Sequence, residues 1–129
     1  MGCDIHAFIE YNTYGSWSSH SAVQIPRNYA VFAALAGVRN YSFESDVPSP
    51  KGSPEDPGWQ YSDAVEEYGP DAHSQSWATL KEFSEALARA KTVYDDPGYF
   101  FYNLALMIMN QLSDHFGEDN VRMVYFFDN

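Results

Sequence analysis

The first residues of the chain place an acid and a histidine on one side of a predicted strand. Alternate side chains of a strand point to opposite faces, so Asp4 and His6 share a face and lie about 7 Å apart at Cα. Both could reach one ion, one proton or one ligand. An acid and a histidine at this spacing suit a divalent metal ion, or a general base with its orienting carboxylate. Cys3 lies on the opposite, apolar face, where packing is favoured over a role as nucleophile.

Further polar residues stand before two predicted helices and at the end of the last strand. Arg27 could clamp a phosphate or carboxylate, helped by backbone N–H groups that follow Asn28. His73 opens a polar stretch before the second helix, and Asp128 ends the last strand. If that strand pairs with the first one, either Asp128 or Arg122 lies near the start of the chain, depending on direction.

These residues together predict one site. The predicted catalytic residues are Asp4, His6 and His73. The predicted ligand-binding residues are Arg27, Asn28, Tyr29, Ser74, Ser76 and Trp77. The predicted ligands of a divalent metal ion, the one cofactor considered, are Asp4, His6, His73 and Asp128. Structural alternatives exist for each group: a core His6 hydrogen-bonded to Asp4, a His73 that only caps a helix, and Arg27 and Arg39 that only pair with the acidic loop of residues 40–75.

Composition limits the classes of partner. The chain has 129 residues with a net charge of −11, so it should be repelled by nucleic acid and by anionic membranes. Its one cysteine excludes an intrachain disulfide and a thiolate zinc site. The longest apolar run, 104–109, is too short to span a bilayer, and no secretory signal is recognisable. We therefore expect a soluble, cytoplasmic protein.

The local patterns predict an α+β fold in a single domain, 1–129. Strands are expected over 3–11, 16–23 and 121–127, so the sheet consists of an N-terminal hairpin and a C-terminal strand. About three helices should cover one face of this small, mostly antiparallel sheet. They are a helix over 29–36 between Asn28 and Gly37, a helix with a capping box at Thr79 and Glu82, and a helix from Asp96 to Phe116. The apolar stripe of the last helix is expected at Phe100, Phe101, Leu104, Met107, Ile108 and Leu112.

Residues 40–75 hold most of the prolines and predict a long acidic loop. Between residues 41 and 78 there are eight acids against Lys51 alone. A loop of this length is typical of a lid over a site, or of a plain insertion. Its charge suits either solvation or a surface that mimics nucleic acid.

The final predicted strand is apolar on both faces, which bears on assembly. One face can pack on helices, whereas Val124 and Phe126 on the other need cover. We therefore predict a homodimer or higher homo-oligomer that buries Phe126 or its neighbours across a two-fold axis. The alternative is a sheet that helices cover on both sides within one chain.

Four blocks of sequence resemble a family of small uncharacterised phage and prophage proteins. They are the opening Met-Gly-Cys-Asp-Ile-His, residues 27–39, residues 73–80 and the ending 121–129. The resemblance implies a phage origin and no particular chemistry. Phage accessory proteins often counter host defences by hydrolysing or sequestering a signal, or by blocking a host protein.

Two functions follow from these patterns. The first is a phage counter-defence protein that binds a phosphorylated or nucleotide-like small molecule in an Asp/His/Arg pocket, with or without metal-assisted hydrolysis. The second is an acidic interaction protein, a nucleic-acid mimic that blocks a basic surface on a host protein. The sequence leaves open whether the protein is an enzyme.

Overall fold

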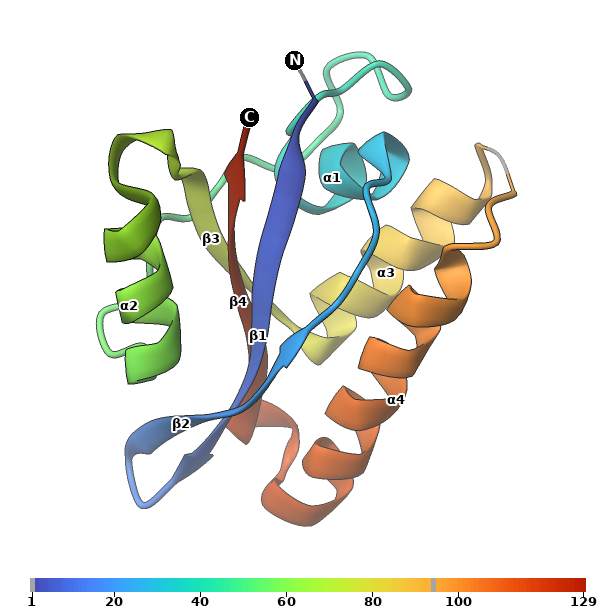
Figure 1. Ribbon diagram of the computed structural model, residues 1–129. Helices are drawn as coiled ribbons and strands as arrows, with labels where there is room; N and C mark the ends of the chain where they lie inside the picture. The colour runs from blue at the N-terminus through green and yellow to red at the C-terminus, as the bar shows by residue number, and fades with distance from the viewer. Residues whose placement is uncertain (1, 94) are drawn as a thin grey trace.

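The computed structural model describes residues 2–93 and 95–129, and this part of the chain has an α+β fold (Figure 1). Its sheet is four-stranded and antiparallel, in the order β2-β1-β4-β3. The strands are β1 (Asp4–Thr13), β2 (Ser16–Val23), β3 (His73–Thr79) and β4 (Val121–Asp128). The helices are α1 (Tyr29–Ala36), α2 (Trp59–Tyr68), α3 (Leu80–Lys91) and α4 (Tyr99–Phe116), with short 3₁₀ turns η1 (Gly69–Asp71) and η2 (Glu118–Asn120). The predicted fold class is confirmed.

Local sequence explains two helix starts. The Asn28 side chain accepts a hydrogen bond from the Val31 N–H and so caps α1, which ends where Gly37 adopts a left-handed conformation at φ 69°. At the start of α3, Thr79 and Glu82 form the predicted reciprocal capping box. These caps fix where α1 and α3 begin on one face of the sheet.

The larger core lies between that face and the helices α1, α3 and α4 (Figure 1). Ile9, Phe32, Phe83 and Met123 are fully buried in it. Cys3 is also fully buried there, and burial raises the pKa of its thiol. A buried, protonated thiol is poorly suited to nucleophilic attack, so the packed interpretation of Cys3 is favoured.

The segment predicted as a loop instead contains α2, η1 and the start of β3. The prediction is wrong from residue 59 onward, because α2 packs on the second face of the sheet (Figure 1). Tyr61 of α2 is buried against Val124 and Phe126 of β4, with Tyr68 beside them. The sheet is thus covered on both faces, and the prediction that Phe126 is buried across a two-fold axis is wrong, since α2 covers it.

The start and the buried face of α4 also differ from prediction. The helix begins at Tyr99 rather than at Asp96, whose carboxylate accepts the Gly98 N–H at 2.7 Å. Its fully or almost fully buried residues are Tyr99, Tyr102, Ala105 and Met109. Four residues of the predicted stripe are exposed: Phe100, Phe101, Leu104 and Met107. The helix is apolar over most of its circumference, so periodicity alone could not choose the buried side.

A buried ion pair joins β1 to β4. Glu10 is fully buried, and its Oε1 accepts hydrogen bonds from Nε and Nη2 of Arg122, both at 2.9 Å. Its Oε2 accepts the Gly58 N–H at 2.6 Å, just before α2 begins. Arg122 also lies 3.8 Å from the centre of the Trp17 ring. The Glu10 carboxylate therefore connects β1 to β4 and to the start of α2, and Arg122 connects this pair to β2.

No helix in residues 2–93 and 95–129 combines the length and the apolar character that crossing a bilayer requires.

Candidate functional site

A hollow opens where β1 loses its neighbour in the sheet. Pairing between β1 and β2 begins at Ala7, opposite Val23, so the three residues of β1 before Ala7 have no strand on that side. The segment that follows β2, residues 24–27, runs beside this gap. The hollow between them has a volume of about 320 Å³, and we call it the β1-edge hollow. Its lining comprises Asp4, Ile5, His6, Ala7, Phe8, Ala22, Val23, Gln24, Ile25, Pro26 and Arg27.

Asp4, His6 and Arg27 of this lining belong to two polar pairs, whose fourth member, Asp128, lies outside the lining. Nε of Arg27 donates to Oδ1 of Asp4 at 3.0 Å, and Nε2 of His6 lies 3.0 Å from Oδ1 of Asp128. Asp4 and Asp128 face each other across β1 and β4, an arrangement of like charges that destabilises a sheet. The hydrogen bond from Arg27 holds the pKa of Asp4 below its usual value. The antiparallel register therefore selects Asp128, and not Arg122, as the neighbour of Asp4.

The hydrogen bond to Asp128 sets the tautomer of the neutral His6 ring. An ionised carboxylate only accepts hydrogen bonds, so His6 donates from Nε2 to Asp128. In the neutral ring, Nδ1 then carries the lone pair and can accept a proton. Ring contacts hold the imidazole, with centroids 4.4 Å from Tyr68 and 5.0 Å from Phe126. The alternative interpretation, a core histidine hydrogen-bonded to Asp4, is wrong, because His6 bonds to Asp128 and its side chain is 28% exposed.

Gly2 allows Arg27 to lie across the start of β1. A Cβ atom at residue 2 would be 2.1 Å from Nη1 of Arg27, far inside contact distance. The guanidinium therefore packs directly on the backbone of Gly2. Any larger residue at position 2 would push the arginine away from the hollow.

Two predicted ligand-binding residues have structural roles instead. Asn28 is 2% exposed, caps α1 and donates from Nδ2 to Asp96 at 3.2 Å. The Tyr29 hydroxyl accepts the Cys3 N–H at 3.0 Å, and Arg39 lies over its ring. They position the segment that carries Arg27, and neither lines the β1-edge hollow.

The third predicted catalytic residue, His73, lies on the other side of the sheet. Its ring stacks on Phe127, whereas His6 stacks on the adjacent Phe126. Neighbouring residues of a strand point to opposite faces, so the two histidines are separated by the sheet. His73 bonds to Ser74 and Asn129, both at 3.0 Å. The structure therefore does not bring His73 or Ser74 together with Asp4 and His6.

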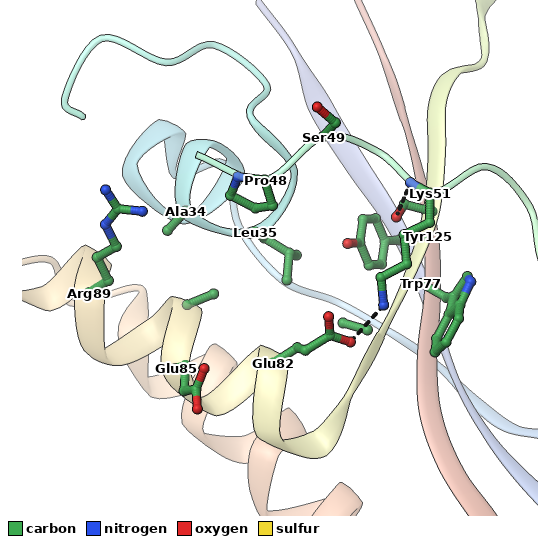
Figure 2. Close-up of a pocket in the computed structure, with 13 residues that line it drawn as sticks. Ala34, Leu35, Pro48, Ser49, Lys51, Trp77, Glu82, Glu85, Arg89 and Tyr125 are labelled. Carbon is green, nitrogen blue, oxygen red and sulfur yellow. Dashed lines mark hydrogen bonds and ion pairs between the residues drawn. The ribbon is translucent and has the colours of Figure 1, made fainter. Parts of the chain in front are cut away.

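A second hollow, of about 270 Å³, lies between β3, α1 and α3, and it contains Ser76 and Trp77 (Figure 2). Nζ of Lys51 sits 3.6 Å above the Trp77 ring and 2.7 Å from Oε1 of Glu82. Burial raises the pKa of the Glu82 carboxyl, but the hydrogen bonds from Lys51 and from the Thr79 backbone outweigh it and hold this pKa below its ordinary value. The Ser76 hydroxyl accepts the Lys51 N–H at 3.0 Å.

The polar groups of this second hollow satisfy one another. The hydroxyl of Tyr125, which is almost fully buried, hydrogen-bonds to Ser76, and burial raises its pKa above the usual range. Each charged group therefore already has a partner. We take the β1-edge hollow as the candidate site, because its two pairs are partly exposed and the Nδ1 atom of His6 is not used by the hydrogen bond to Asp128.

The donor geometry bears on the predicted metal ion. Within the described residues, no group of three or more His, Cys, Asp or Glu side chains is arranged to hold one. Asp4 and Asp128 instead hold Arg27 and His6.

Sequence reasoning missed four residues that shape these sites. Lys51, Glu82 and Tyr125 line the second hollow, and Glu10 anchors β1 to β4. Glu10 carried no clear signal, because alternation places it on the same face of β1 as Asp4 and His6. Comparison of the chain with protein-family models, with curated proteins and with solved structures finds no match.

Proposed function

We propose that the protein binds a small phosphorylated, nucleotide-like molecule in the β1-edge hollow, with His6 as an acid–base group. The observation that carries this proposal is that the Asp4–Arg27 pair and His6, whose Nε2 is bonded to Asp128, come together at one open hollow. In the phage context that the sequence resemblance implies, the ligand would be a host defence signal, and the protein would sequester or hydrolyse it.

Arg27 is the group suited to a phosphate. A guanidinium offers a planar fork of N–H donors that matches phosphate oxygens. Its present partner, Asp4, is 55% exposed and Arg27 is 48% exposed, so solvent screens their ion pair and it contributes little to stability. A phosphate carries more charge than a carboxylate and can replace Asp4 at modest cost.

His6 supplies the chemistry. With Nε2 fixed on Asp128, Nδ1 can take a proton from a nucleophilic water and return it to a leaving oxygen. Asp128 holds the tautomer and stabilises the charged ring while the proton resides on it. A volume of about 320 Å³ lies at the small end of ligand pockets, which suits a ligand near the size of one nucleotide.

Calorimetric titration of nucleoside monophosphates and of inorganic phosphate tests the proposal. Arg27→Ala should weaken binding at least tenfold, because the fork is lost. His6→Ala should abolish turnover with the far-ultraviolet circular dichroism unchanged, and the matched variant His115→Ala, an exposed histidine in the last turn of α4, should behave like the native protein. Equal binding and activity in native protein and His6→Ala would remove His6 from the site, and an unfolded His6→Ala would make it a core residue.

A second function is favoured by the exposure of the acidic segment. All eight acids between residues 41 and 78 are exposed: Glu44, Asp46, Glu55, Asp56, Asp63, Glu66, Glu67 and Asp71. Such a surface suits a basic, nucleic-acid-binding face of a host protein. This function predicts partner binding that weakens steeply as salt rises. Neutralising Glu55, Asp56, Glu66 and Glu67 would then abolish biological activity, whereas His6→Ala would not.

A further inference from the structure

Two uncharged stretches of the chain lie together on the surface. Residues 11–26 and 97–113 contain no Asp, Glu, Lys or Arg, although charged residues make up 19% of the chain. The first stretch includes β2 and the second nearly all of α4 (Figure 1). A hollow of about 400 Å³ is lined by both, with His20–Gln24 on one side and Phe101, Leu104, Ala105 and Ile108 on the other. We call this combined surface the α4/β2 face.

Both parts of the α4/β2 face are incompletely covered. Phe100 and Met107 on α4 are 63% and 66% exposed, and Phe101 and Leu104 are 48% and 43% exposed. The other part, β2, is an edge strand, so one side of its backbone faces no other strand of the described residues. Clustered exposed apolar side chains beside an open strand edge mark an interaction surface.

We propose that the α4/β2 face binds a second copy of this chain, so that the protein is a homodimer. Charge identifies the occupant. Two copies that each carry a net charge of −11 repel one another, so they can associate only where contact brings no further like charges together. In a two-fold interface each residue meets the same surface patch of the partner, and an uncharged patch satisfies this condition. A basic partner would instead be attracted to the exposed acids around α2.

The β1-edge hollow shares Ala22, Val23 and Gln24 with the α4/β2 face but contains none of the exposed α4 side chains, so substitutions on α4 leave the lining of the ligand site unchanged. It also differs from the dimer predicted from the sequence. That prediction used the apolar face of β4, which α2 covers, whereas α4 leaves its own apolar residues outside the core.

Sedimentation equilibrium at micromolar concentration tests this interface. The native protein should have twice its chain mass of 14.6 kDa. Met107→Glu and Phe100→Glu each place two acids near the two-fold axis and should shift the dissociation constant at least a hundredfold toward monomer. Because both side chains are mostly exposed, the variants should fold, which circular dichroism and urea unfolding will verify.

Trp59→Glu is the matched control. Trp59 is 69% exposed, close to the value for Met107, but lies on α2 at the acidic side of the molecule. It should remain dimeric. The proposal would be overturned if the native protein sediments as a monomer up to about 100 micromolar. It would also be overturned by a dimer that neither α4 variant dissociates, or by one that Trp59→Glu dissociates equally.

Discussion

Breaking the buried pair of Glu10 and Arg122 should lower the free energy of unfolding more than breaking any other ion pair described above. Glu10→Gln keeps the shape of the side chain but removes the negative charge, and Arg122 is only 6% exposed. Breaking one side of a buried pair typically costs about 3–5 kcal/mol, because the remaining charge is left without compensation. Arg122 keeps one partial substitute, since Asp56 lies 3.6 Å away and is 62% exposed. We therefore expect a loss of about 3 kcal/mol in the free energy of unfolding.

Urea unfolding followed by tryptophan fluorescence measures this loss. The matched control is Glu85→Gln, because Glu85 is 66% exposed and lies 4.0 Å from Lys81, so its loss should be below about 0.5 kcal/mol. The double variant Glu10→Met with Arg122→Met should recover most of the stability, since no charge is then buried. A loss below about 1 kcal/mol for Glu10→Gln, or a double variant less stable than Glu10→Gln, would refute this reasoning.

Three further outcomes follow from the structure. Arg27 lowers the pKa of Asp4, so this pair stabilises the protein above the ordinary carboxyl pKa and loses its effect as the pH falls below about 4. Asp4→Asn should therefore reduce the difference in the free energy of unfolding between pH 7 and pH 3. Thr79→Ala removes one half of the capping box with Glu82 and should cost about 1 kcal/mol in urea unfolding, and an unchanged midpoint would contradict that role. Phe126→Ala leaves a cavity under α2 and should cost about 3–5 kcal/mol by the same measurement, whereas a loss near zero would mean that α2 does not cover this residue.

Elements with strong local signals could be predicted from the sequence. The hairpin of β1 and β2 follows from alternation around a glycine turn, and α1 follows from Asn28 and Gly37. The helix α2 was missed although Tyr61, Ala64, Val65 and Tyr68 have helical spacing, because the prolines before it favoured a loop. Its exposed acids reinforced that interpretation.

The arrangement of the candidate site depended on long-range pairing. That Asp4 and His6 share a face is a local property, and it could be predicted from alternation. The position of His73 could not, because β3 has little apolar alternation and becomes a strand only through pairing with β4. A register irregularity between His73 and Ser76 then decides the face on which each side chain lies. Pairing across the sheet therefore separated residues that sequence reasoning had grouped together.

The strand order has a consequence for synthesis of the protein. β1 is made first, yet its inner neighbour β4 is made last of the four strands, and Glu10 precedes Arg122 by 112 residues. While the ribosome adds the intervening residues, the nascent chain carries a hairpin whose apolar side and inner edge have no cover. The sheet therefore closes in one late step, and until then the growing chain is a natural client for chaperones.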